Sequence, residues 1–333
     1  MSDRNQQVVL AERPQGRVST KHFRLVDAPL PQPREGQVLV RNLWLSLDPY
    51  MRWRMNEGPS YAEPVELGAV MVGATVGEVV VSHHPAFRAG DHVTGNLGWQ
   101  SHAVAAASQL RALDNHNLPL QAYLGVAGMP GVTAWVGLME ILAAKAGETL
   151  LVTAAAGAVG SVAGQLAKLN GCRVVGLAGG PDKCLFAENE LQFDACIDYR
   201  SPRFDEELAD TLPDGVDCLF ENVGGALFDQ LLLCMRPFGR IALCGMVADA
   251  DAAEPHALRN LRTLLVKRLR LQGFIVTDHL QRWRVAQNEL VKLVADGRIK
   301  YRETVAHGLA QAPAAFVGML AGRNLGKQLV KLV

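Results

Sequence analysis

Residues 150–179 constrain the fold more than any other part of this chain, because they read as strand, turn, helix and second strand. An apolar run at 150–152 leads into a turn of small residues, and a helix of small and apolar residues follows. A second β-branched run at 173–177 closes the unit. Such a β-turn-α-β unit places free N–H groups and the positive end of a helix dipole together, which favours the pyrophosphate of a dinucleotide.

The glycine pattern of the turn is imperfect. Aligned to G-x-G-x-x-G, residues 155–160 read AAGAVG, so that Ala155 stands in the first glycine position. The alternative is a glycine-rich turn in an ordinary α/β domain. The strand before the turn, the helix after it and the second strand at the right distance favour the dinucleotide interpretation.

The end of the second strand indicates which dinucleotide binds. An NAD site needs a carboxylate about 20 residues past the glycines for the ribose diol, but this strand ends in Ala178, Gly179 and Gly180. Lys183 follows within one turn, and a cation beside an open turn suits a 2′-phosphate. Asp182 is interpreted as the N-cap of the next helix. The alternative for Lys183 is a solvated surface lysine; we predict NADP(H).

The remaining sequence divides a chain of 333 residues into two domains. Residues 1–125 contain short β-like runs separated by Gly and Pro, which predicts a compact β-barrel-like domain. Residues 126–298 alternate strands and helices, as a doubly wound parallel sheet requires, and 299–333 return to short strands that should close back onto the first domain. The predicted fold class is therefore α/β. The later strands of the parallel sheet are expected at 194–199, 216–223, 239–246 and 269–276.

Composition excludes several classes of partner. Lys plus Arg equals Asp plus Glu at 33 each, which gives no reason to expect a nucleic acid or an acidic membrane surface as partner. No run of about 18 apolar residues is present, and the first residues are polar, so we expect neither membrane insertion nor secretion. All six cysteines fall within 172–244, mostly in apolar runs, which is typical of free thiols in a reducing cytoplasm.

Several segments resemble one protein family. They read LSLDPYMR (45–52), GMPGVTAWVGL (128–138), AAAGAVGSVAGQLAK (154–168), ENVGG (221–225), GRIALCG (239–245) and GRNLGKQLVKLV (322–333). They look like the prostaglandin reductase family, which includes leukotriene B4 12-hydroxydehydrogenase, plant alkenal double-bond reductases and bacterial NADPH-dependent curcumin reductase. That family belongs to the zinc-free medium-chain dehydrogenase/reductases. The resemblance runs from about residue 25 to the C-terminus.

The resemblance implies a GroES-like β-barrel domain (1–125, completed by 299–333), a Rossmann domain (126–298) and a cleft between them. It also implies a reaction, in which hydride from NADPH adds to the β-carbon of an α,β-unsaturated ketone or aldehyde. The resemblance also implies the cofactor contacts. Ala158, Val159, Gly160 and Ser161 correspond to the pyrophosphate turn, Lys183 and Tyr199 to the 2′-phosphate position, and Asn222 to a ribose position. Cys244, Gly245, Phe274 and Ile275 correspond to the nicotinamide end, and Asn324 to a contact from the C-terminal segment.

The proton donor departs from the family pattern. After the fifth strand the family often has a tyrosine near the cofactor, where this chain has Ala250. Tyr50 remains as the catalytic candidate, because a neutral phenol can hydrogen-bond a carbonyl or enolate oxygen while water supplies the α-proton. The alternative is a packing tyrosine at a strand-to-helix corner.

We expect no metal site. The zinc alcohol dehydrogenases of this superfamily need an N-terminal cysteine and a later four-cysteine cluster, but the first cysteine here is Cys172. The adjacent His83 and His84 have no thiolate or carboxylate at ligand spacing. Adding hydride to an electrophilic enone needs less help from a Lewis acid than oxidising an alcohol, which favours a reductase.

Two other functions stay open. An NADPH:quinone reductase shares the fold and the glycine turn, and hydride transfer to a quinone needs no acid. A non-catalytic NADPH-binding protein would also keep the turn. For assembly we expect a homodimer, because the apolar run 269–276 would otherwise leave an exposed sheet edge.

Overall fold

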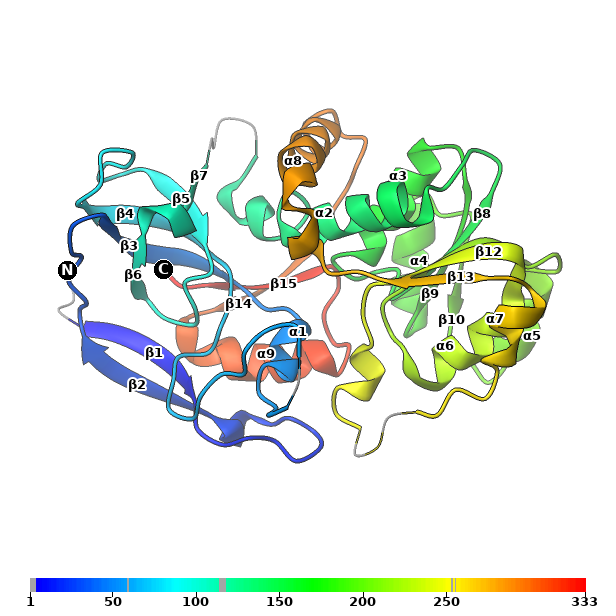
Figure 1. Ribbon diagram of the computed structural model, residues 1–333, viewed down its shortest axis with the longest axis horizontal. Coiled ribbons are helices and arrows are strands. Elements are labelled where there is room, and N and C mark those ends of the chain that lie inside the picture. The colour runs from blue at the N-terminus through cyan, green and yellow to red at the C-terminus, as the bar shows by residue number, and fades with distance from the viewer. Residues whose placement is uncertain (1–3, 59, 114–117, 253, 255) are drawn as a thin grey trace. The chain divides into compact units, whose positions relative to one another are not determined.

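The computed structural model describes residues 4–58, 60–113, 118–252, 254 and 256–333. The chain divides into two compact units. Unit 1 comprises Met1–Gly125 and Glu303–Val333, and unit 2 comprises Val126–Arg302. Each unit has its own sheet (Figure 1).

Unit 2 is built on a six-stranded parallel sheet with the strand order β10-β9-β8-β11-β12-β13. Numbered along the chain within this unit, the order is 3-2-1-4-5-6, which is the Rossmann arrangement. Its strands are β8 (Thr149–Thr153), β9 (Arg173–Ala178), β10 (Ala195–Asp198), β11 (Val216–Glu221), β12 (Met235–Leu243) and β13 (Arg270–Gly273). The chain order reverses between β8 and β11, so the crevice for a ligand is expected at their carboxyl ends.

Helices connect these strands, as the alternating pattern predicted (Figure 1). The connecting helices are α3 (Gly160–Leu169), α4 (Pro181–Asn189), α5 (Phe204–Thr211), α6 (Gly225–Leu231) and α7 (Arg262–Val266), whereas α2 (Met129–Val136) precedes β8 and α8 (Leu280–Ala295) follows β13. Every residue of β8 is buried, because the strand lies in the middle of the sheet with helices on its faces.

Two local predictions for unit 2 were wrong. Asp182 is not an N-cap: Gly180, at φ +103°, caps α4, and Asp182 lies inside the first turn. Only glycine adopts this φ without strain, which is why the cap falls there. The last three strands end earlier than predicted: β11 ends at Glu221, β12 at Leu243 and β13 at Gly273, after which a 3₁₀ turn starts at Val276.

Unit 1 contains a seven-stranded sheet and a separate two-stranded one, β1 (Arg4–Leu10) with β2 (Phe23–Pro29). The larger sheet has the order β14-β15-β3-β4-β5-β7, with β6 also pairing with β3. Its strands are β3 (Gln37–Ser46), β4 (Thr75–Ser82), β5 (His92–Gly95), β6 (His102–Ala106), β7 (Arg111–Ala112), β14 (Glu303–His307) and β15 (Lys327–Lys331). Strand β15 runs antiparallel to β3, so the C-terminal segment is part of this sheet.

The core of unit 1 is centred on three aromatic rings. Trp99, fully buried, stacks on Phe23 at 5.4 Å between ring centroids and meets Phe316 edge-on at 5.5 Å. Phe316 belongs to α9 (Ala312–Leu320), which follows β14 in the chain. These contacts join both segments of unit 1 into one hydrophobic core.

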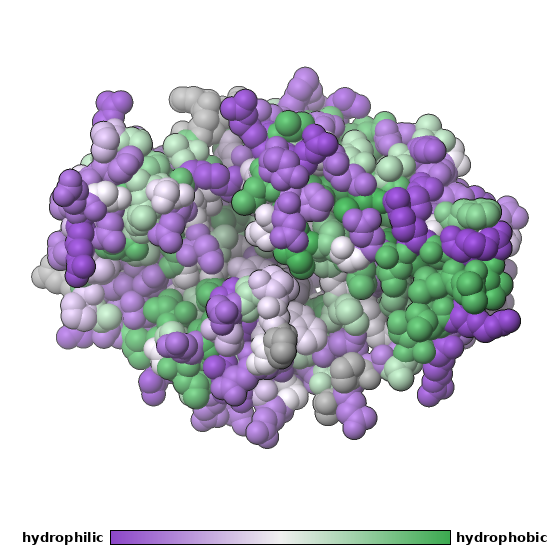
Figure 2. Space-filling model, viewed as in Figure 1, coloured by the Kyte–Doolittle hydropathy of each residue, from purple (hydrophilic) through white to green (hydrophobic). Residues whose placement is uncertain are grey.

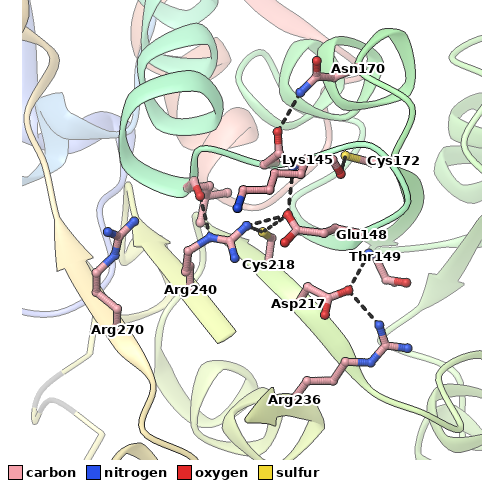
Figure 3. Close-up of polar contacts among 12 residues, drawn as sticks. Lys145, Glu148, Thr149, Asn170, Cys172, Asp217, Cys218, Arg236, Arg240 and Arg270 are labelled. Atoms are coloured by element: carbon pink, nitrogen blue, oxygen red, sulfur yellow. Dashed lines mark hydrogen bonds and ion pairs between the residues drawn. The ribbon is translucent and has the colours of Figure 1, made fainter. Parts of the chain in front are cut away.

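An ionic network crosses the amino-terminal part of the unit 2 sheet (Figure 3). Arg240 on β12 reaches Glu148, which precedes β8, and donates a hydrogen bond to the Leu142 carbonyl at 2.6 Å. The Arg240 guanidinium lowers the pKa of Glu148 against the opposing effect of its burial. The Cys218 thiol lies 3.1 Å from Arg240, and burial raises its pKa to about 12, so it packs as an unreactive thiol in this network.

All six cysteines are free. This agrees with the expectation of unpaired thiols, although Cys196, Cys234 and Cys244 are only half-buried. Among the described residues, no helix has the length and apolar character needed to cross a membrane.

Candidate functional site

The turn between β8 and α3 is closed to side chains. A β-carbon on Gly160 would lie 2.4 Å from the Ala154 carbonyl oxygen, and one on Gly157 would lie 3.0 Å from the same atom. Ala158 and Val159 are half-buried between these glycines, and Ser161 is buried in the first turn of α3. Helix α3 has ten residues, and its N-terminus therefore presents backbone N–H groups at the carboxyl end of β8.

The end of β9 forms a second part of the site. A β-carbon on Gly180 would meet nothing within 4 Å, so the turn is open there. Lys183 is half-buried on α4, and Tyr199, which follows β10, is 37 % exposed. A β-carbon on Gly179 would lie 2.6 Å from the Tyr199 hydroxyl, so Gly179 lets this phenol approach the tip of β9.

Asn222 joins the two central strands at the point where the chain order reverses. Its backbone N–H donates to Thr153 Oγ1 at 2.7 Å, and its side-chain Nδ2 donates to the Thr153 carbonyl at 2.8 Å. A β-carbon on Gly245 would lie 3.0 Å from the Asn222 carbonyl oxygen, so glycine permits the close approach of the segment after β12. Asn222 is thereby fixed at the crevice.

Glu221, the last residue of β11, is a fully buried carboxylate beneath this crevice. One of its oxygens accepts the N–H groups of Val223 at 2.5 Å and Gly224 at 2.7 Å. Its Oε2 has no hydrogen-bond partner among the described residues. Burial raises the pKa of Glu221 to about 7, and burial with the nearby Glu221 charge raises the pKa of the Cys244 thiol to about 12.

This carboxylate should make stability depend on pH. Because the folded-state pKa of about 7 exceeds the ordinary value, the folded chain binds more protons, and the stabilisation is complete below about pH 4.5. It is lost as pH rises through about 7, at a cost of roughly 1–3 kcal/mol. Between pH 5 and 8 the melting temperature of the wild type should therefore fall relative to that of Glu221→Gln.

Differential scanning calorimetry at matched ionic strength measures this difference. Glu206→Gln, on the exposed face of α5, is the control and should follow the wild type across the pH range. Parallel pH curves for the wild type and Glu221→Gln would show that Glu221 is ionised in the folded protein throughout.

The ends of β12 and β13 complete this edge. The N–H groups of Cys244 and Gly245 both donate to the Glu221 carbonyl, at 2.8 and 3.2 Å. Phe274 is buried directly after β13, where its ring meets Phe220 edge-on at 6.3 Å, and the half-buried Ile275 follows. Eleven of the twelve cofactor positions expected from the sequence therefore lie in unit 2, at the carboxyl ends of its strands, in the turns that follow or in the first turns of the next helices.

The other two expected residues belong to unit 1. Asn324 precedes β15, and its Nδ2 donates to the Gly326 carbonyl at 2.8 Å. Tyr50 is the first residue of α1 (Tyr50–Trp53) and packs half-buried against the core of unit 1. Among the described residues, none hydrogen-bonds the Tyr50 hydroxyl. Burial and the nearby Asp48 carboxylate raise the pKa of Tyr50 above its usual value, so the phenol stays protonated.

Sequence reasoning missed the buried ion pair beside Tyr50. Lys327 Nζ lies 2.5 Å from Asp48 Oδ1 and donates to the Leu47 carbonyl at 2.7 Å, with both side chains almost fully buried. The Ser46 hydroxyl hydrogen-bonds the other oxygen of Asp48. The sequence signal that could have revealed this pair is that Asp48 lies in the distinctive segment LSLDPYMR and Lys327 in the distinctive segment GKQLVK.

Ala250, where the family often has a tyrosine, is buried and carries no polar side chain. Among the described residues, no group of three His, Cys, Asp or Glu side chains is arranged to hold a metal ion.

The residues of unit 2 fit a dinucleotide with a 2′-phosphate. The cradle at Gly157 and Gly160 has no room for a β-carbon, and the N-terminus of α3 supplies anion-binding N–H groups beside it. At the end of β9, where residues 178–180 include no acid, the open Gly180 turn and the half-buried Lys183 suit a phosphate monoester.

Comparison with known proteins places the chain among oxidoreductases. Residues 6–113 match a family model described as the N-terminal domain of oxidoreductase, and residues 158–294 match one described as zinc-binding dehydrogenase. The NADPH-dependent curcumin reductase of Escherichia coli is 46 % identical over 99 % of this chain and 97 % of that protein. The NADP⁺-dependent 2-alkenal reductase of Nicotiana tabacum is 39 % identical over 98 % of this chain and 97 % of its own length.

A solved structure agrees over the whole chain. CurA from Vibrio vulnificus, in complex with NADPH, superposes with a TM-score of 0.94 at 43 % identity, covering 98 % of this chain and 99 % of CurA. These matches confirm the predicted fold class, an N-terminal oxidoreductase domain with a Rossmann-like parallel sheet.

Proposed function

Because this chain belongs to the oxidoreductase family of NADPH-dependent curcumin reductase, 2-alkenal reductase and prostaglandin reductase 1, we infer that it is an NADP(H)-dependent enone reductase. It reduces the carbon–carbon double bond of α,β-unsaturated ketones and aldehydes. The observation that carries this conclusion is the full-length match to such reductases, together with the closed glycine turn and the acid-free end of β9.

The cofactor is held by unit 2 along the carboxyl edge of its sheet. We assign the pyrophosphate to the turn 158–161 and the 2′-phosphate to Lys183 and Tyr199. Asn222 is assigned to a ribose, and the ends of β12 and β13, at Cys244, Gly245, Phe274 and Ile275, to the nicotinamide end. Asn324 of unit 1 is assigned to the cofactor as well.

Tyr50 is assigned as the catalytic residue. When bound, NADPH supplies the hydride that is added to the β-carbon of the substrate. Negative charge then accumulates on the carbonyl oxygen, where the Tyr50 hydroxyl donates a hydrogen bond, and water supplies the proton to the α-carbon. The raised pKa of Tyr50 supports this role, because only the neutral phenol can donate.

Substrate choice tests this function against the quinone alternative. Loss of NADPH absorbance should be followed with curcumin, a 2-alkenal, pulegone and a benzoquinone, and the product of each reaction should be identified by mass spectrometry. We expect saturation of the double bond with the carbonyl retained. Turnover confined to the benzoquinone would favour a quinone reductase, and no turnover with tight NADPH binding would favour a non-catalytic protein.

Lys183→Ala should separate the two cofactors. A charge-assisted contact to the 2′-phosphate is worth about 1.5 kcal/mol or more, so the KM for NADPH should rise at least about tenfold while weak use of NADH stays nearly unchanged. Steady-state kinetics with both cofactors and one enone measures this. Equal losses with NADPH and NADH would show that Lys183 supports the fold of α4 rather than the phosphate.

A homodimer is supported by an apolar surface on unit 2. This surface consists of Leu233, Phe238, Leu261, Leu265 and Val266, of which Leu265 is 77 % and Phe238 67 % exposed. Figure 2 shows hydrophobic side chains gathered over β12, β13 and α7. Strand β13 is also an open edge of the sheet, and exposed edges and large apolar patches are typical of interfaces.

This surface predicts the oligomeric state. Multi-angle light scattering at micromolar concentration should give twice the 36.0 kDa mass of the chain. Leu265→Glu should raise the dissociation constant at least about tenfold, because burying an unpaired carboxylate costs more than about 1.4 kcal/mol. Leu185→Glu, the same substitution of an exposed leucine on α4 outside this surface, is the control. A wild-type monomer at these concentrations would contradict the assignment.

The six free cysteines support a cytoplasmic location for the enzyme.

A further inference from the structure

A second cation lies beside Lys183 at the end of β9. A β-carbon on Gly179 would lie 2.9 Å from Arg200 Nε, so this guanidinium folds back over the tip of the strand. The charge of Arg200 adds to burial in lowering the pKa of Lys183, as expected for two cations that are close together. Both therefore lie at the Gly179–Gly180 turn, where strand β9 itself ends without an acid.

Backbone contacts hold Arg200 in this place. Oδ1 of Asp198, at the end of β10, accepts the N–H of Gly180 at 2.8 Å and that of Arg200 at 2.9 Å. The Arg200 guanidinium carbon lies 5.6 Å from the centroid of the Tyr199 ring, in a cation–π contact. Asp198 thus connects the loop after β10 to the turn after β9 and fixes the backbone position from which the Arg200 side chain extends.

The guanidinium itself has no acidic partner. Within the part of the chain that the structure describes, no carboxylate pairs with Arg200, whereas Arg203 pairs with Glu206 at 3.0 Å and Arg302 with Glu190 at 2.7 Å. Two neighbouring cations repel each other unless an anion lies near both. A guanidinium also offers a planar fork of donors that matches phosphate oxygens better than a second ammonium would.

We propose that Arg200 is a specificity-determining residue that binds the 2′-phosphate of NADP(H) together with Lys183. The proposal rests on the NADP(H)-dependent function above. The shared position of the two cations at the open glycine turn, with the Tyr199 hydroxyl beside them, is the geometry that carries it. Lys183 provides a point charge, and Arg200 provides a directed pair of N–H donors.

The experiment measures nucleotide binding to the full chain without turnover. Adenosine 2′,5′-bisphosphate and 5′-AMP differ only in the 2′-phosphate. Isothermal titration calorimetry gives the dissociation constant of the tighter ligand directly and that of the weaker ligand by competition. Arg200→Ala should weaken binding of the bisphosphate about tenfold and change 5′-AMP binding less than about twofold. Arg200→Lys should recover part of the loss. Arg203→Ala, three residues on and paired with Glu206, is the matched control and should leave both constants unchanged.

The outcomes separate this proposal from the cofactor assignment. If the wild type prefers the bisphosphate and Arg200→Ala keeps that preference, the proposal is overturned while the cofactor assignment stands. If Arg200→Ala weakens both nucleotides equally, Arg200 supports the loop or the adenine instead, and the proposal again fails. If the wild type itself does not prefer the bisphosphate, the NADP(H) assignment falls and the proposal with it.

Discussion

Lys327→Met should destabilise unit 1 by about 3–5 kcal/mol, because it leaves the buried Asp48 carboxylate without its cation. Lys327 is 4 % exposed, and its ammonium lies 2.5 Å from Asp48 Oδ1. After the change, the Ser46 hydroxyl is the remaining donor that the structure places on the Asp48 carboxylate.

Hydrogen exchange is the suitable measurement, because two units need not unfold together. Amides of β3 and β15 should lose protection, while those of β8 and β11 in unit 2 should keep theirs. Lys331→Met, on an exposed lysine of the same strand, is the control and should cost less than about 0.5 kcal/mol. The double variant Asp48→Asn with Lys327→Met should regain much of the loss. Equal effects of the two lysine variants would show that the pair does not stabilise unit 1.

Tyr50→Phe should lower turnover of enones about tenfold to a hundredfold, which is the usual value of one hydrogen bond to a developing oxyanion. Reduction of a benzoquinone should hardly change, because aromaticity stabilises the product oxygens. Since burial and Asp48 raise the pKa of Tyr50, the wild type should show no alkaline loss of enone turnover from this group up to about pH 10.

The measurement compares the turnover of the wild type and Tyr50→Phe with one enone and one quinone at saturating NADPH. Tyr61→Phe, which removes an exposed phenol near Tyr50, shows whether any phenol in this region has the same effect. If Tyr50→Phe keeps full enone turnover, Tyr50 only packs against the core of unit 1. Stabilisation of the carbonyl oxygen would then come from water or the nicotinamide ribose.

The strands of unit 2 could be predicted because their signal is local. Apolar runs such as those of β8 and β9 are buried on both faces, so hydrophobicity alone identifies them. The glycine turn and the missing acid at the tip of β9 could be read for the same reason, since both depend on backbone space and on residues within a few positions.

The features that the sequence did not reveal depend on long-range contacts. The partner of Asp48 is separated from it by 279 residues, and no spacing rule relates the two. The position of Arg200 depends on Asp198 binding a backbone N–H from another strand. Asp182 was misassigned because the conformation of Gly180, at φ +103°, takes the capping position instead.

The pairing of β15 with β3 has a consequence for the order of folding during synthesis. All of unit 2 is translated between the two segments of unit 1, and β15 supplies the buried Leu329 and Val330 as well as Lys327. Unit 2 can therefore fold while the ribosome is still translating, but unit 1 must wait with residues 44–46 of β3 unpaired on one edge and with an uncompensated Asp48. Unit 1 can be completed only after all of unit 2 has been translated, and until then these residues of β3 are open to chaperones.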